Sequence, residues 1–226
     1  MSLQMNKNNK QKINYQKELD RILQRIEGEE KVPTLMLHSC CAPCSSYVLE
    51  YLSRYFRITV LYYNPNISPE EEYRKRVGEI ERLIGEMTFR YPVSFVEGRY
   101  DPQEFYQMAK GMEDLPEGGE RCFCCFALRL EEAAKEALAY HCDYFCTTLT
   151  ISPLKNEQKI NEIGLEIAEK YGLRFLVSDF KKKNGYKRSI ELSKEHDLYR
   201  QNFCGCIFSK LEQERRQNAG RESNNI

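Results

Sequence analysis

No apolar run in this sequence is long enough to cross a lipid bilayer, and the polar, charged segment 1–31 lacks the apolar stretch of a signal peptide. We therefore expect a cytoplasmic protein without a membrane partner, in a reducing compartment where thiols stay available for metals. The chain also has no excess charge of either sign, because 34 Lys+Arg balance 34 Asp+Glu. An anionic partner must therefore be held by a local basic patch.

Histidine is also scarce, and of the three histidines only His38 stands beside a cysteine-rich segment. A lone histidine at a strand end is more often structural than a proton donor. Cysteine, by contrast, is abundant, with ten residues in a chain of 226. A chain of this length with 41% hydrophobic residues can bury a core without a disulfide scaffold, so the cysteines point to metal or redox chemistry.

Apolar, β-branched runs alternate along the chain with segments of helical periodicity. This alternation predicts an α/β fold with a mostly parallel, layered sheet. We expect a tail at 1–12, one catalytic domain at 13–211 and a charged tail at 212–226. The expected strands cover 34–37, 58–63, 92–98, 173–180 and the start of 143–153. The expected helices cover 13–26, 45–55, 70–87, 102–112, 126–140 and 156–172, with one more before the Cys-Gly-Cys turn.

Ligands of parallel sheets collect at the carboxyl ends of the strands, in the loops that lead into helices. The loops in these positions are HSCCAPCSS, NPNISP and TLTISPLKN. The first of them carries three cysteines, and a second cysteine-rich segment, CFCC, stands just before the expected helix 126–140. Two thiolate-rich loops of this kind can converge on one site.

Thiolates are soft ligands that select zinc, copper(I) or iron–sulfur clusters, and four of them complete the coordination of either a zinc ion or a four-iron cluster. Adjacent cysteines such as Cys40 and Cys41 seldom bind the same tetrahedral ion, whereas a larger cluster accommodates neighbouring ligands more easily. A helix N-terminus after the second segment would also favour anionic ligands. We therefore favour an iron–sulfur cluster, with Cys40, Cys41, Cys122 and Cys125 as its ligands.

The other cysteines divide into two kinds. Cys142 and Cys146 flank a buried strand and are best interpreted as small hydrophobic residues. Cys204 and Cys206 form a Cys-Gly-Cys turn, which can close only a strained, easily reduced disulfide. Such a redox-active disulfide suits an electron relay or a redox switch, and the alternative is two unlinked thiols beside a glycine turn.

Polar and basic residues around these loops are candidates for substrate binding. The basic stretch that includes Lys187, followed by Tyr199 and Arg200, suits contact with a phosphate backbone, although a solvated loop is the common alternative. The strand-end loops add hydroxyl, amide and ammonium groups, whose alternative role is to cap helices and form turns. These loop candidates are Asn64, Asn66, Thr147, Thr148, Ser152, Lys155 and Asn156.

Taken together, the motifs HSCCAPC, YYNPNISP, RCFCC, TTLTISPLKN and YRQNFCGCIFS resemble those of the epoxyqueuosine reductases of the QueH type, from about Leu35 to Leu211. The resemblance implies a Rossmann-like (HUP-type) sheet flanked by helices, with cysteine loops at the strand carboxyl ends. It further implies the last step of queuosine biosynthesis, in which epoxyqueuosine at the wobble position of tRNA is reductively deoxygenated to queuosine without cobalamin. The implied partners are the tRNA substrate and an electron donor protein or other reductant.

By the same resemblance, Cys40, Cys41, Cys122 and Cys125 correspond to the ligands of a 4Fe–4S cluster. An adjacent iron or zinc ion is also implied, and Cys44 would offer it a thiolate where some members carry an acidic residue. Because one cluster passes electrons singly, Cys204 and Cys206 are candidates for a second redox centre with a catalytic role. Cys124 has no assigned part.

Two other classes of protein remain open at this stage. One is another cluster-dependent tRNA-modifying enzyme, such as an ATP-dependent sulfur transferase. That enzyme would need a glycine-rich phosphate loop after the first strand, where HSCCAPCSS has no glycine. The other is a zinc-bound, cysteine-rich module that holds RNA without chemistry, which would be colourless where a cluster protein is brown.

Overall fold

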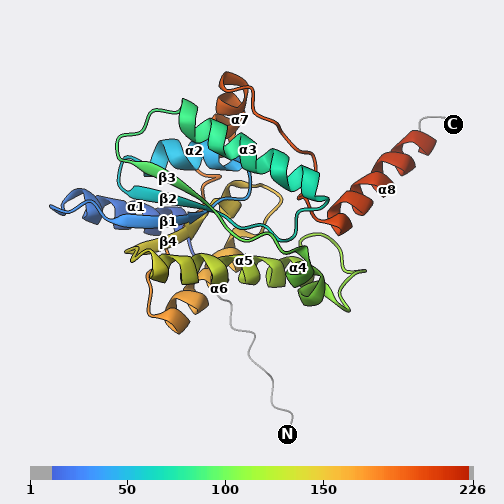
Figure 1. Cartoon of the computed structure of the whole chain (residues 1–226), viewed down its shortest axis with the longest axis horizontal. Helices are drawn as coiled ribbons and strands as arrows, with labels where there is room; N and C mark the ends of the chain where they lie inside the picture. The colour runs from blue at the N-terminus through green and yellow to red at the C-terminus, as the bar shows by residue number, and fades with distance from the viewer. Residues whose placement is uncertain (1–11, 224–226) are drawn as a thin grey trace, which may run out of the picture.

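The computed structural model describes residues 12–223, with side chains placed as far as Arg216. Its centre is a four-stranded, all-parallel sheet in the order β3-β2-β1-β4 (Figure 1). The register places Leu35 of β1 opposite Ile58 of β2 and Tyr144 of β4, and Ile58 opposite Val93 of β3. The strands are β1 (Thr34–His38), β2 (Arg57–Tyr62), β3 (Val93–Glu97) and β4 (Tyr144–Thr147).

Helices cover both faces of the sheet, so the α/β architecture predicted from the sequence is confirmed. Helices α2, α3 and α7 lie over one face, and α4, α5 and α6 lie over the other (Figure 1). The helices of the described residues are α1 (Tyr15–Glu27), α2 (Ala42–Leu52), α3 (Glu70–Glu86), α4 (Pro102–Ala109), α5 (Glu120–Ala139), α6 (Glu157–Tyr171), α7 (Gly185–Glu195) and α8 (Ile207–Ser223), with a 3-10 turn, η1 (Thr148–Ile151), after β4.

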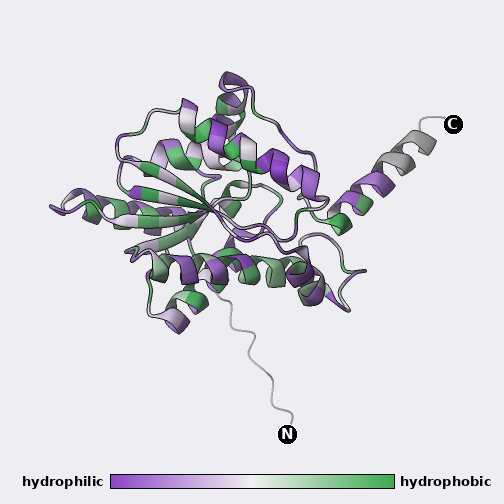
Figure 2. Ribbon diagram, in the orientation of Figure 1, coloured by the Kyte–Doolittle hydropathy of each residue, from purple (hydrophilic) through white to green (hydrophobic). Residues whose placement is uncertain are grey.

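Strands β1, β2 and β4 are largely buried, whereas the edge strand β3 is partly exposed along its whole length. The burial of β1, β2 and β4 explains why they appear in the sequence as apolar runs (Figure 2). Side chains alternate between two hydrophobic clusters along each strand. In β1, Leu35 and Leu37 pack with α2 and α3, whereas Met36 packs with α5 and α6. In β4, Tyr144 and Phe145 divide between the clusters in the same way.

The prediction of a strand at 173–180 is wrong, because this segment makes only one isolated parallel bridge, between Phe145 and Phe175. The side chain of Asn161 explains why the ladder does not continue. Its amide donates to the carbonyl oxygen of Ser178 at 2.8 Å and accepts from the Ser178 N–H at 2.9 Å. Both backbone groups of Ser178 are thereby satisfied by a helix side chain instead of by a neighbouring strand.

Two helix boundaries also differ from the sequence predictions. Helix α5 begins at Glu120 instead of near 126, so the CFCC segment lies within its first two turns and not before it. Gly118, with a φ of 86°, and the N-cap Gly119 end the preceding loop earlier than the alanine-rich pattern suggested. At the other end, α8 continues through Ser223, so part of the segment expected to be a charged tail is helical. Of the tail expected at 1–12, only Lys12 lies among the described residues.

Within residues 12–223, no helix combines the length and the apolar composition needed to span a membrane.

The first turn of α6 is fixed by an ion pair that makes the stability of the fold depend on pH. Glu157 lies 3.3 Å from the ammonium of Lys181 and 3.0 Å from that of Lys12, and its side chain is 14% exposed. Burial acts to raise the pKa of Glu157, but the hydrogen bond from Lys12, a backbone N–H and the charge of Lys181 lower it to about 2. The stabilisation is therefore complete above the ordinary value of 4.5 and is lost as the pH falls toward 2.

We expect the free energy of unfolding to fall by about 2 kcal/mol more in the wild type than in Glu157→Gln between pH 5 and pH 2. Urea denaturation at a series of pH values measures this difference. Glu162→Gln, a substitution of an exposed glutamate on the same helix, serves as the control and should follow the wild type. Identical pH profiles for the wild type and Glu157→Gln would show that the ion pair does not contribute.

Candidate functional site

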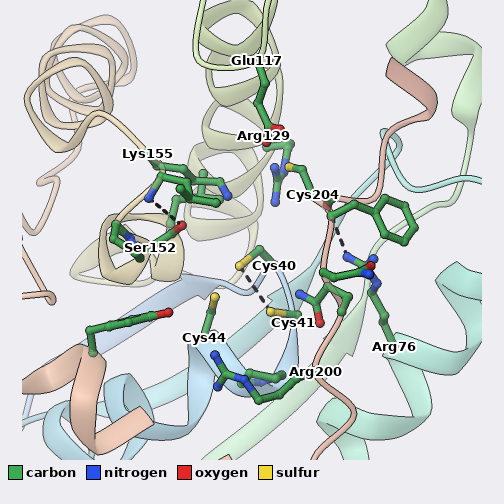
Figure 3. A pocket seen from close by; sticks show the side chains of 18 residues that line it. Cys40, Cys41, Cys44, Arg76, Glu117, Arg129, Ser152, Lys155, Arg200 and Cys204 are labelled. Carbon is green, nitrogen blue, oxygen red and sulfur yellow. Dashed lines mark hydrogen bonds between the residues drawn. The ribbon is translucent and has the colours of Figure 1, made fainter. Parts of the chain in front are cut away.

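A cavity of about 290 Å³ lies at the carboxyl ends of β1 and β4, where the sequence placed the ligand-binding loops. Figure 3 shows its walls, with the thiols of the first cysteine loop turned toward one another. A smaller cavity lies next to it, and Glu117 and Cys204 line both. The labelled residues around the larger cavity are Cys40, Cys41, Cys44, Arg76, Glu117, Arg129, Ser152, Lys155, Arg200 and Cys204.

The first cysteine loop connects β1 to α2, and Cys41 is the N-cap residue of α2. The sulfur atoms of Cys40, Cys41 and Cys44 lie within 4.8 Å of one another, and those of Cys40 and Cys41 are 3.9 Å apart. Hydrogen bonds from Cys41 and Cys44 lower the pKa of Cys40, and the same coupling raises that of Cys41 to about 12. The loop thus favours one thiolate beside two thiols at a helix N-terminus, which suits a soft metal.

Cys122 and Cys125 lie three residues apart on α5 and so share one face of its first two turns. They line the smaller cavity together with Cys204 and Cys206. Burial raises the pKa of Cys125 to about 12. In the absence of a metal Cys122 and Cys125 are therefore neutral thiols, and a cation that displaced their protons would bind them as thiolates.

All ten cysteines belong to the described residues and are free thiols, so the expected disulfide between Cys204 and Cys206 is not supported. Gly205 between them adopts a φ of 112°, a conformation that glycine allows without strain. The turn is held by its backbone, because Gly205 O accepts from Ser68 N at 3.0 Å and Cys204 O accepts from Arg76 at 3.3 Å. The turn brings both thiols to the cysteines of α5 without an S–S bond.

A buried polar group lies between the two cysteine loops. The guanidinium of Arg129 donates from Nε to His38 Nε2 at 3.2 Å and from a terminal nitrogen to Asn64 Oδ1 at 2.6 Å. His38 Nδ1 lies 2.8 Å from Thr147 Oγ1. Burial, assisted by the charge of Arg129, lowers the pKa of His38 to about 3, so the ring is neutral. His38 is therefore a structural residue whose Nε2 accepts from Arg129 and also lies 3.2 Å from the carbonyl oxygen of Tyr63.

Some of the predicted substrate-binding residues line the larger cavity, and others support its walls. Ser152, Lys155 and Arg200 are cavity-lining, whereas Thr148 accepts from Cys40 N at 3.2 Å and donates to Cys40 Sγ at 3.4 Å. Asn66 lines the smaller cavity. The rest lie elsewhere: Asn64 and Thr147 in the buried polar group, Asn156 at the N-cap of α6, Lys187 exposed on α7, and Tyr199 hydrogen-bonded to Glu72.

Arg129, Glu117 and Tyr186 line the larger cavity but were not singled out individually by the sequence analysis. For Arg129 a signal was present, because it lies four residues after Cys125 and therefore on the same face of α5. Glu117 had no comparable signal, because it belongs to an irregular loop whose path depends on contacts outside that loop.

Comparison with known proteins places the same residues in a described family. The family model "Epoxyqueuosine reductase QueH" matches residues 35–212. The chain is 44% identical over 207 residues to the epoxyqueuosine reductase QueH of Staphylococcus epidermidis. The aligned region covers 90% of this chain and 87% of that protein. It is 43% identical to the QueH of Streptococcus pyogenes (90% and 81% covered) and 37% identical to that of Haemophilus influenzae (94% and 86% covered).

Proposed function

This chain belongs to the QueH family of epoxyqueuosine reductases, and we propose that it reduces epoxyqueuosine in tRNA to queuosine, the last step of queuosine biosynthesis. The protein is accordingly an oxidoreductase. The observation that carries the proposal is the cavity at the carboxyl ends of β1 and β4, where three thiols converge beside Cys204, Lys155 and Arg129. A site of this kind combines ligands for a redox centre with room for part of a nucleoside.

The thiols that line the two adjoining cavities suit an iron–sulfur centre. Cys40 and Cys41 from one loop, with Cys122 and Cys125 from α5, supply the four soft ligands that a 4Fe–4S cluster needs. Cys44 lies close enough to Cys40 and Cys41 to offer a thiolate to an adjacent iron or zinc ion. When bound, these centres would supply single electrons and a Lewis acid without cobalamin. The reducing cytoplasm is the compartment in which such thiols persist.

Removal of the epoxide oxygen as water breaks two C–O bonds, forms a C=C bond and consumes two electrons and two protons. The electrons come from an external donor protein or reductant. Lys155 is the residue best placed to hold a proton near the reacting oxygen, because it lines the cavity next to Ser152, on the wall opposite Cys204 (Figure 3). Burial acts to lower the pKa of Lys155, but the negative charges of Cys204, Cys40 and Cys44 in their thiolate forms outweigh burial and raise it. The ammonium can therefore donate a hydrogen bond to the epoxide oxygen.

Recognition of the tRNA is assigned to the rim formed by the first turn of α7 and the segment after α7. Arg200 and Tyr186 line the mouth of the cavity, and Lys187 lies exposed next to Tyr186. Cationic groups beside an aromatic ring suit a phosphate backbone with an unstacked base. Ser152 lines the opposite wall with a hydroxyl that can contact the nucleoside. Cys204 and Cys206, which line the smaller cavity together with the cysteines of α5, are assigned a redox role between the electron donor and the cavity.

The decisive experiment is anaerobic purification followed by a visible spectrum and measurement of iron, sulfide and zinc. We expect brown protein that holds iron and sulfide and that converts epoxyqueuosine-containing tRNA to queuosine-containing tRNA, as followed by nucleoside mass spectrometry. Cys40→Ser and Cys122→Ser should lose the iron, the colour and the activity together. Colourless protein that holds stoichiometric zinc after anaerobic reconstitution would contradict the reductase proposal and favour an RNA-binding zinc module.

A further inference from the structure

Arg129 is a buried cation whose hydrogen-bond partners are all neutral. The residue is 1% exposed, and its guanidinium donates to Asn64 Oδ1 and to His38 Nε2, which carries no proton when it accepts, so the ring is neutral. Among the described residues, no carboxylate oxygen lies within 4.0 Å of the guanidinium nitrogens of Arg129, the distance that defines an ion pair. Arg76, another deeply buried arginine of the site, is by contrast paired with Glu72 at 2.7 Å. The charge of Arg129 is therefore held in place by groups that do not neutralise it.

An uncompensated buried charge costs several kcal/mol, so such a residue needs a counter-anion somewhere in its surroundings. The thiols of Cys40 and Cys204 line the larger cavity together with Arg129, and Cys125 lies one turn before it on α5. Glu117 and Lys155 line the same cavity, but Glu117 makes no ion pair with the guanidinium among the described residues. An arginine keeps its charge in proteins, so the candidates for its counter-anion are thiolates formed by Cys40, Cys125 and Cys204.

His38, Asn64 and Thr147 fix the direction of this charge. The three residues come from the ends of β1, β2 and β4, which form the rigid floor of the site. A carboxylate in place of Asn64 or His38 would hold the arginine equally well but would cancel its charge. The neutral partners leave that charge free to act on the space between the two cysteine loops.

We propose that Arg129 is a positioning residue that acts as the fixed counter-cation of an anionic centre held between the Cys40–Cys41 loop and the Cys122–Cys125 face of α5. The inference rests on the proposed function, because that centre is the thiolate-bound cluster. A fixed cation favours whichever state of the centre carries more negative charge. Arg129 should therefore stabilise the loaded protein over the metal-free protein and the reduced centre over the oxidised one.

The test compares Arg129→Met, Arg129→Lys and the wild type in metal-free and anaerobically reconstituted form. Loss of the hydrogen bonds to His38 and Asn64 lowers the stability of both the metal-free and the reconstituted form of Arg129→Met. This loss therefore cancels in the difference between the melting temperatures of the two forms. We expect the rise in melting temperature on loading to fall by about half or more in Arg129→Met and to be largely retained in Arg129→Lys. At the potential where half of the wild-type centre is reduced, the ratio of reduced to oxidised centre should fall about tenfold in Arg129→Met, equivalent to about 59 mV for one electron.

Lys135→Met is the matched control, because it removes an exposed cation from the same helix. It should leave both the loading-induced shift and the reduced fraction unchanged. If Arg129→Met lowers the melting temperature of both forms equally and leaves the reduced fraction unchanged, Arg129 is a structural residue only and the inference is overturned. Wild-type protein that takes up neither iron nor sulfide would overturn the proposed cofactor itself, and the counter-cation role with it.

Discussion

Replacement of Cys125 by serine should abolish iron binding and lower reductase activity by more than about 100-fold, a larger loss than that caused by removing an outer partner of a metal ligand. Replacement of the adjacent Cys124 should leave iron content and activity within about twofold of the wild type. The reason is the geometry of α5, in which Cys122 and Cys125 share the face that lines the smaller cavity. Cys124 lies between them in sequence and lines neither cavity.

The pair of variants is well matched, because each exchanges one sulfur for one oxygen on the same two helical turns. Iron and sulfide per chain, the visible spectrum and the queuosine content of treated tRNA are measured on anaerobically reconstituted protein. Far-ultraviolet circular dichroism checks that both variants keep the fold. Loss of iron in Cys124→Ser with retention in Cys125→Ser would show that the assignment of Cys125 as a ligand is wrong.

The layered fold was predictable because its evidence is local. Strands β1, β2 and β4 are largely buried, so Leu35 to Leu37 and their counterparts form apolar runs that no exposed element would need. The failed strand at 173–180 is equally apolar, and Phe175, Leu176 and Val177 are indeed buried. What the sequence could not show is that Asn161, on a different helix, takes up the backbone groups of Ser178. Apolar periodicity predicts burial, whereas strand pairing depends on partners far along the chain.

The candidate site also has some features that the sequence could predict and others that depend on partners far along the chain. Cysteines were recognisable because their chemistry is unusual and their spacing is short. Threonine and asparagine at the strand ends were expected to face a substrate, yet Thr148 hydrogen-bonds Cys40 and Asn64 accepts from Arg129. These residue types serve internal and external partners equally well, so their type alone does not tell where they point. Buried arginines escape sequence analysis for a related reason, since arginine is usually exposed and its burial depends on tertiary partners.

Arg76→Met should be among the most destabilising single substitutions at this site, lowering the free energy of unfolding by about 3–5 kcal/mol. The side chain of Arg76 is 2% exposed and pairs with Glu72 at 2.7 Å, so its loss leaves a carboxylate that is only 14% exposed without its cation. Arg76 also donates to the carbonyl oxygen of Cys204 at 3.3 Å and lies over the ring of Phe203, 5.3 Å from its centroid. The substitution should therefore release the turn that carries Cys204 from α3.

Two measurements separate these effects. Urea denaturation gives the loss of stability, and the rate of alkylation of Cys204 in metal-free protein, followed by peptide mass spectrometry, reports release of the turn. Arg74→Met is the control on the same helix, because Arg74 is 52% exposed and its pairs with Glu70 and Glu97 lie at the surface. It should leave the free energy of unfolding close to that of the wild type and the alkylation rate unchanged. A similarly small cost for Arg76→Met, with Cys204 still protected, would show that contacts such as the 3.0 Å hydrogen bond from Ser68 N to Gly205 O suffice to hold the turn.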